Sequence, residues 1–267
     1  MKKIVVATIL VIGTLLILSY NILYNRWEHL WTLEKTKAFY SIKHHNDDTL
    51  RVLMIGDSWA GMHHEGGLDS LFVSMLQSEI CRPAKFEASG KGGEKSRGIY
   101  KLMFEESQYG TRRFLLDGPD YCIISAGIND AAANMGTIQY CHHYNLILDF
   151  LLKNHICPVV IEIPDVDIWH LYSEKPFWDL AGDFLKAGMT GCRLYHYSEY
   201  REDLINMLKE KQLMERIIFV PMEGWNSRSP SINPDLFLED RIHLNKEGYR
   251  KLDSCIIKAI VFHYNNR

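Results

Sequence analysis

Short apolar runs alternate with longer stretches of helical periodicity through most of the chain. An apolar run of five or so residues is typical of a buried strand, and apolar residues every three or four positions are typical of a helix. The strand-like runs are residues 51–55, 84–88, 121–125, 158–163 and 216–220. The helical stretches are residues 67–78, 95–106, 137–154, 200–211 and 246–263. This alternation predicts an α/β domain over residues 49–267, with a mainly parallel five-stranded sheet between two layers of helices.

One helical stretch also predicts part of the core. Tyr140, Tyr144, Ile147 and Leu151 recur at helical spacing within residues 137–154. Residues so spaced lie on one face of a helix, so we expect these four side chains to pack against the sheet.

The first residues of the chain have a different pattern. Residues 4–18 carry no charge, and with residues 22–24 they form an apolar segment of about 21 residues, long enough to cross a bilayer as a helix. Lys2 and Lys3 favour a cytoplasmic N-terminus, a bias that Arg26 weakens. We therefore predict a membrane anchor over residues 1–24, a juxtamembrane linker over 25–48, and a domain outside the cytoplasm. A cleaved signal peptide is the alternative, although residues 18–21 lack the pair of small residues typical of a cleavage site.

Composition narrows the functional classes. The 267 residues are 47% hydrophobic and 24% charged, which fits one large α/β domain. A net charge of −3 provides no basic footprint for nucleic acid. The six cysteines form no Cys-x-x-Cys pair, and the adjacent histidine pairs would not face each other on a helix. We expect no metal, no cofactor and no nucleic-acid partner, and the sequence leaves the oligomeric state and any disulfide pairing open.

Candidate chemistry begins with Gly56-Asp57-Ser58, directly after the first strand-like run. A serine at the carboxyl end of a strand lies where open α/β sheets place their sites. The same tripeptide is also ordinary turn chemistry, so alone it decides little.

Three further segments favour a catalytic serine over an ordinary turn. They are residues 90–96, which are rich in glycine, Gly127-Ile128-Asn129-Asp130, and Asp240-Arg241-Ile242-His243. With Gly56-Asp57-Ser58, and in this order, they resemble the SGNH (GDSL-type) hydrolase family over about residues 51–262. The resemblance implies a three-layer flavodoxin-like sandwich with strand order 2-1-3-4-5. The family's four named residues correspond to Ser58, Gly93, Asn129 and His243.

The chemistry of these residues fits the resemblance. A serine hydroxyl becomes a good nucleophile when a neighbouring base accepts its proton; His243 would be that base and Asp240 would orient it. The backbone N–H groups of Ser58 and Gly93 and the side-chain amide of Asn129 would form an oxyanion hole. We interpret the carboxylates at positions 57 and 130 as groups that fix turns.

The substrate class is the least determined property. Aromatic residues collect in residues 164–195, and a further tryptophan, Trp225, lies in residues 224–234. We expect both segments to be loops that overhang the site. Trp59, Trp169 and Trp225 are candidate substrate-binding residues, with packing beneath the loops as the alternative. Trp59 stands where the family usually has a smaller aliphatic residue. We predict a serine esterase acting on short O-acyl esters, acetyl above all, carried by carbohydrate. A cell-envelope acyltransferase with the same site, or a lipase or thioesterase, is the alternative.

Overall fold

The computed structural model describes residues 2–172, 174–222, 224–227 and 236–266. Two compact units divide the chain, Met1–Glu34 and Lys35–Arg267. The first unit contains the helix α1 (Lys2–Arg26) and a short 3-10 turn, η1 (Glu28–Leu30). α1 is long and apolar enough to cross a membrane, with a mean hydropathy of 2.2, and a signal sequence would meet the same criterion.

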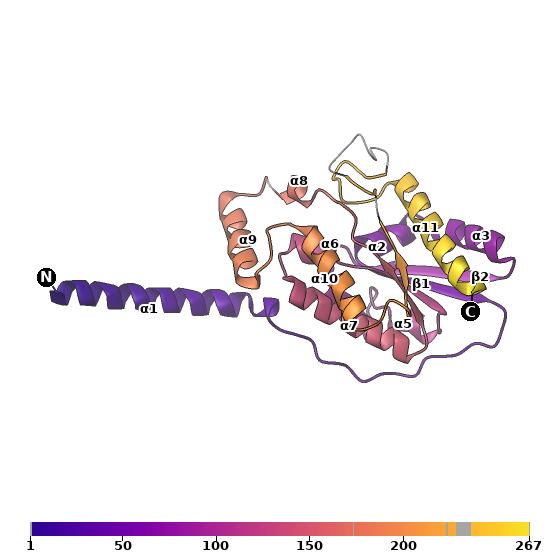
Figure 1. The fold of residues 1–267 in the computed structure, drawn as a ribbon, viewed down its shortest axis with the longest axis horizontal. Helices are drawn as coiled ribbons and strands as arrows, with labels where there is room; N and C mark the ends of the chain where they lie inside the picture. Colours follow the sequence, from indigo (N-terminus) through magenta and orange to yellow (C-terminus); the bar gives the residue numbers. More distant parts are fainter. Residues whose placement is uncertain (1, 173, 223, 228–235, 267) are drawn as a thin grey trace. The chain divides into compact units, whose positions relative to one another are not determined.

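The second unit is built on a five-stranded parallel sheet with the strand order β2-β1-β3-β4-β5 (Figure 1). This is the flavodoxin-like order that the family resemblance implied. The strands are β1 (Leu50–Gly56), β2 (Ala84–Gly90), β3 (Tyr121–Ser125), β4 (Cys157–Ile161) and β5 (Ile218–Val220).

Helices cover both faces of the sheet, as predicted (Figure 1). α3 (Asp69–Ile80) and α11 (Lys246–Asn265) pack together on one face, where α3 contacts β2 and α11 contacts β5. α7 (Thr137–Lys153) contacts β4 on the other face, between α4 (Ser96–Leu102) and α10 (Tyr197–Glu210). Shorter helices lie in the connections: α2 (Ser58–Glu65), α5 (Arg112–Leu116), α6 (Ile128–Ala132) and α8 (Ile168–Tyr172).

The central strands form the middle of the core. Every residue of β1, β3 and β4 is buried, as a strand covered on both faces requires. α7 contributes one continuous stripe to the same core. The four residues predicted for that stripe, Tyr140, Tyr144, Ile147 and Leu151, are all fully buried.

Residues 164–195 are not the loop region that we predicted. They contain α8 and a 14-residue helix, α9 (Phe177–Thr190). Two of the residues that suggested loops lie at the ends of this helix: Pro176 precedes its first turn, and Gly191 ends it in the left-handed conformation with φ 74°. Gly182 and Gly188 lie within the helix. Of the second predicted loop, residues 224–234, only residues 224–227 lie among the described residues.

The end of the predicted linker is part of the domain. The compact unit begins at Lys35 instead of residue 49, and residues 35–49, which we call the strap, lie against it. The Tyr40 hydroxyl donates to the Met103 carbonyl at 2.6 Å, and its ring contacts the rings of Phe104 and Phe150. Ile42 is buried in the main core. The strap therefore covers apolar surface between α4 and the end of α7.

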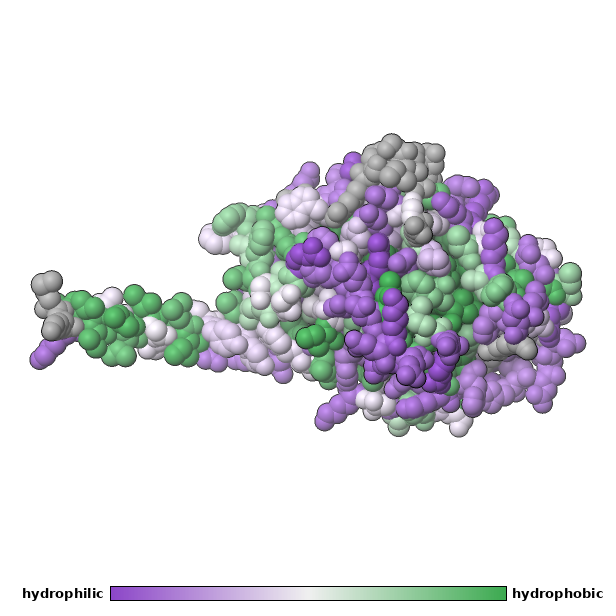
Figure 2. Space-filling view, in the orientation of Figure 1, coloured by the Kyte–Doolittle hydropathy of each residue, from purple (hydrophilic) through white to green (hydrophobic). Residues whose placement is uncertain are grey.

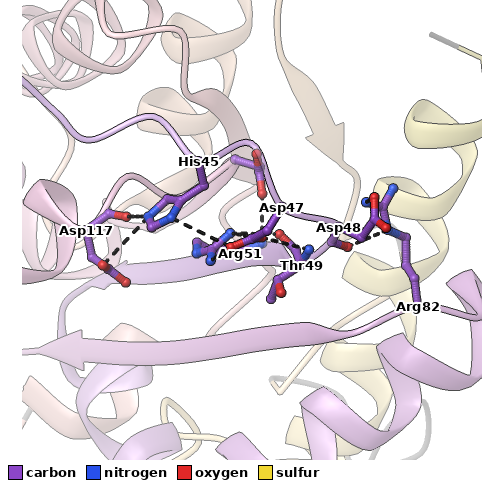
Figure 3. A network of polar contacts seen from close by, with 8 residues as sticks. His45, Asp47, Asp48, Thr49, Arg51, Arg82 and Asp117 are labelled. Atoms are coloured by element: carbon purple, nitrogen blue, oxygen red, sulfur yellow. Dashed lines mark hydrogen bonds and ion pairs between the residues drawn. The ribbon is translucent and has the colours of Figure 1, made fainter.

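A polar network fixes the last residues of the strap to the start of the sheet (Figure 3). Arg51 donates two hydrogen bonds to the Asp47 carboxylate, at 2.8 and 2.7 Å. The His45 ring nitrogen Nε2 lies 2.5 Å from the carbonyl oxygen of Asp117, after α5. Such bidentate Arg–carboxylate pairs add geometric specificity, so they define where the strap ends and β1 begins.

Gly90, at the end of β2, allows the sheet to approach the turn at Asp57. A Cβ added at Gly90 would lie 2.2 Å from the Asp57 carbonyl oxygen and 2.6 Å from the Gly61 nitrogen, both backbone atoms. We expect Gly90→Ala to lower the free energy of unfolding by about 1–3 kcal/mol, measured by denaturant titration. Gly92→Ala is the control, because a Cβ there meets nothing within 4 Å. Equal losses in the two variants would show that this close approach is not the cause.

Candidate active site

The Ser58 side chain lies at a tight strand-to-helix turn. β1 ends at Gly56, and Ser58 is the first residue of α2. A Cβ at Gly56 would lie 2.3 Å from the Ser125 carbonyl oxygen, so a side chain could not be accommodated there. The first N–H groups of a helix have no acceptor within it, so the turn presents both the Ser58 hydroxyl and its N–H as available groups.

His243 reaches the Ser58 hydroxyl from a loop before α11. Nε2 of His243 lies 2.9 Å from Oγ of Ser58, and Nδ1 lies 2.5 Å from Oδ2 of Asp240. A carboxylate can only accept, so Nδ1 carries the proton and the neutral ring accepts the serine proton at Nε2. The structure thus brings together the three residues that the sequence proposed as one unit.

Asp240 is also held by its own loop. Its Oδ1 accepts hydrogen bonds from the backbone N–H groups of Ile242 and His243, both at 2.9 Å. Partial burial raises the pKa of Asp240, but the hydrogen bonds from the His243 ring and from these two N–H groups outweigh it and hold the pKa below its usual 3.8. Asp240 is therefore ionised at neutral pH and accepts the hydrogen bond from Nδ1 of His243.

Asn129 lies in the first turn of α6, and its side chain points toward the same turn at Asp57. Its side-chain Nδ2 donates to the Glu94 carbonyl at 3.0 Å and lies 3.5 Å from Oδ2 of Asp57. The bond to Glu94 thus holds one N–H of the amide in place, and the longer contact to Asp57 engages the other N–H only weakly. Gly93 has φ 73° and open space around it, but no contact identifies which N–H of this loop faces Ser58, so its role stays a prediction.

Two buried carboxylates support these groups from below. Asp57 accepts from the Trp59 N–H at 3.0 Å and from the Ser125 hydroxyl at 2.9 Å. Asp130 accepts from both the N–H and the hydroxyl of Ser96, at 2.9 and 2.7 Å, where α4 begins. Burial raises the pKa of each to about 6. Their contacts are those of groups that fix turns, which is the role we inferred from the sequence.

Trp59 connects the serine turn to the histidine loop. Its indole N–H donates to the Ile242 carbonyl at 3.1 Å, and its own carbonyl accepts from the Tyr249 hydroxyl at 3.0 Å. The side chain is 2% exposed. Sequence reasoning did not single out Tyr249, because a tyrosine one turn into α11 looks like any core residue.

The other two candidate substrate-binding tryptophans differ in exposure. Trp225 is 3% exposed, with the Lys251 ammonium 4.8 Å from its ring centroid. Trp169, on α8, is 45% exposed. Of the three proposed rings, only Trp169 offers solvent-accessible area in this structure, so the substrate-binding proposal is carried forward for that residue.

The loop after β4 reaches the histidine loop. Asp167 accepts a hydrogen bond from the Arg241 guanidinium at 3.2 Å, and its N–H donates to the Ser227 hydroxyl at 2.8 Å. Arg241 adjoins Asp240 in sequence, so the segments after β4 and β5 border the site as we expected. Within the described ranges, no three His, Cys, Asp or Glu side chains are grouped as metal ligands.

The sequence matches the model of a known protein family over most of its length. The model of the GDSL-like lipase/acylhydrolase family matches residues 54–251, a span that includes every candidate site residue. No curated protein is similar enough in sequence to be matched.

Solved structures with this fold include several esterases. An acetyl xylan esterase, AlAXEase, is 16% identical, with a TM-score of 0.57 over 79% of this chain and 100% of that one. Axe2, an acetylxylan esterase from Geobacillus stearothermophilus, is 16% identical, with a TM-score of 0.54 over 79% and 94%. The lipase/acylhydrolase from Enterococcus faecalis is 14% identical, with a TM-score of 0.53 over 80% and 96%. Identities this low show a shared fold. The match of the family model shows that the chain belongs to the GDSL-like lipase/acylhydrolase family and is an SGNH-type ester hydrolase.

Proposed function

We propose that this ester hydrolase removes short acyl groups, acetyl above all, from carbohydrate through an acyl-serine intermediate. The observation that carries the proposal is the continuous hydrogen-bond chain Ser58–His243–Asp240 beside the amide of Asn129. This arrangement supports the roles proposed for these residues: a nucleophile, a base, a group that orients the base, and a neutral donor.

The geometry supports a two-stage reaction. Oγ of Ser58 attacks the ester carbonyl carbon while Nε2 of His243 accepts the hydroxyl proton. The negative charge that develops on the carbonyl oxygen is stabilised by the Ser58 N–H and the Asn129 amide. Collapse of this intermediate breaks the ester C–O bond, and His243 returns the proton to the leaving alcohol. Water then attacks the acyl-serine by the same path and releases the acid.

A fluorophosphonate probe tests the nucleophile directly. The probe should label wild-type protein and the Ser74→Ala variant, since Ser74 is an exposed serine that bonds only its own helix. It should not label Ser58→Ala, because the activated hydroxyl is gone. Labelling that persists in Ser58→Ala, measured by mass spectrometry, would place the nucleophile elsewhere.

Asn129→Ala tests the oxyanion donor. We expect kcat to fall about 10²- to 10³-fold with KM nearly unchanged, because the amide acts on charge that develops only in the transition state. Asn129→Asp is nearly isosteric, but it replaces the donor by a negative charge and should lose at least as much. A change confined to KM in steady-state kinetics would argue against this role.

The hydrogen bonds of Trp59 suggest that it positions the base. The indole donor holds the Ile242 carbonyl, one residue before His243, and so restrains the loop that carries the base. The Tyr249 bond restrains Trp59 itself without touching that loop. These two bonds can be removed separately, each by a single conservative substitution.

Trp59→Phe and Tyr249→Phe therefore form a matched pair. Each should lower the free energy of unfolding by about 1–3 kcal/mol, because each leaves one buried carbonyl without its donor. Only Trp59→Phe should also lower kcat, with KM nearly unchanged, because only it frees the loop of His243. The two kcat values should be compared under conditions in which the same fraction of each variant is folded. Equal values would show that Trp59 affects catalysis only through the stability of the fold.

Short acyl groups on carbohydrate suit the border of the site better than fatty esters. Trp169 offers an exposed ring, and polar side chains such as Asp167 lie close to it in the chain. Sugars combine C–H faces that stack on rings with hydroxyls that need polar partners. Two proteins of the same fold are acetyl xylan esterases by name, which supports the same substrate class.

Acyl-chain preference tests this class. Acetyl esters should give a higher kcat/KM than esters of eight or more carbons, and Trp169→Ala should slow acetylated glycans more than a small chromogenic acetate. Preference for long chains would favour the lipase alternative. Acetate that is released only when an acceptor sugar is present would favour the acyltransferase alternative.

We also propose that α1 is retained as a membrane anchor and holds the domain outside the cytoplasm. The apolar length of α1 and the lysines before it support this arrangement. Recovery of a soluble mature chain that begins after about residue 20 would instead identify α1 as a cleaved signal.

A further inference from the structure

α9 presents an apolar face to solvent. Its outward residues recur at positions one, two, eight and nine of the helix, which lie on one side. Their exposed fractions are 71% for Phe177, 81% for Trp178, 55% for Phe184 and 51% for Leu185. Figure 2 shows this region as an apolar patch over α9 on the surface of the domain. Soluble proteins rarely leave so many large apolar side chains together in water.

The face of α9 that is turned toward the domain buries a carboxylate beside Ala187. Asp183 is 4% exposed and forms ion pairs with Lys175 at 2.7 Å and Lys186 at 2.9 Å. The Tyr195 hydroxyl also donates to it at 2.5 Å. A surface helix usually turns its large apolar side chains toward the core, whereas α9 leaves four of them outward and buries a charged residue.

The charges near α9 cancel. Residues 174–193 contain three acidic side chains and three basic ones: Glu174, Asp179 and Asp183 against Lys175, Lys186 and Arg193. A partner that binds here would be attracted by apolar contact and not by a field of one sign. Tryptophan and phenylalanine are the residues that proteins place at the boundary between lipid and water.

The chain supplies a bilayer within reach. α1 ends at Arg26 and the domain begins at Lys35, so the intervening segment spans at most about 30 Å. A domain held this close meets the lipid surface at high effective concentration, so that even a weak apolar contact is populated. With 14 residues, α9 is too short to cross the bilayer but long enough to lie in its surface.

We propose that α9 is an interfacial helix, whose apolar face lies in the surface of the same bilayer that α1 spans. The inference rests on the proposed anchoring role of α1, and it holds for any substrate of the site. It explains why the exposed face is rich in aromatic residues and why the buried face carries the ion pairs.

The test uses the full chain in lipid nanodiscs with one copy per disc, which excludes contact with a second copy. Discs are made with phosphatidylcholine or with its dibrominated form, which quenches tryptophan only at close range. The signal of Trp178 is the difference in emission between wild type and Trp178→Phe, a variant that keeps an aromatic ring. We expect brominated lipid to reduce this difference at least twofold, at low and at high salt.

A tryptophan on α11, which lies at the opposite end of the domain from α9 (Figure 1), provides the matched control. Phe262 is 73% exposed on α11, and Phe262→Trp in the Trp178→Phe background should show no quenching. Equal emission from Trp178 in both lipids would overturn the proposal, as would quenching that disappears at high salt. A Trp178 signal that is blue-shifted but unquenched would overturn it in favour of a protein contact.

The same samples separate this inference from the proposals on which it stands. A chain recovered free of lipid would refute the anchor. Loss of acetyl esterase activity in Ser58→Ala discs tests the proposed function, and this measurement does not depend on quenching. An active, disc-bound chain with unquenched Trp178 would refute the interfacial helix alone.

Discussion

The buried carboxylate of Asp57 is the interaction on which the site depends. The register of the sheet sets Gly56 opposite both Gly90 and Ser125, so three strands end at one level. Just beyond that level, Asp57 accepts hydrogen bonds from the start of α2 and from the Ser125 hydroxyl. Burial opposes its ionisation, and these donors offset part of that cost. The orientation of the serine turn and that of the neighbouring strand are therefore set by one group.

Much of this architecture could be predicted because it follows from local patterns. The apolar runs gave the strands to within a few residues, and the stripe from Tyr140 to Leu151 gave the face of α7. Three of the four short motifs directly follow predicted strands, and parallel strands that end at the same edge bring these three together. The fourth motif, which contains Asp240 and His243, lies just before the last predicted helix. The distances between Ser58, His243 and Asp240 agree with the roles proposed for them.

Other features depend on contacts between distant parts of the chain. Trp59 lies next to Ser58 in sequence, but its hydrogen bond to Ile242 crosses 183 positions, and nothing local indicates it. α9 was missed for a different reason: its aromatic residues lie among prolines and glycines, which we interpreted as loop residues, although Gly182 and Gly188 are accommodated within the helix. The strap looked like a linker because its few apolar residues show no periodicity. Even so, Tyr40 packs on Phe104 and Phe150, and Ile42 is buried in the main core.

The strap also decides how the domain can be separated from its helix. Cleavage between Arg26 and Lys35 would leave all of residues 35–49 in place. Cleavage at residue 49, where the periodic pattern begins, would remove Tyr40 and Ile42 and leave Phe104 and Phe150 facing water. Release of the domain by a protease would thus yield an intact enzyme if cleavage occurs before Lys35. It would yield an aggregation-prone enzyme if cleavage occurs about fifteen residues later. A recombinant soluble form faces the same choice, and its first residue should be no later than Lys35.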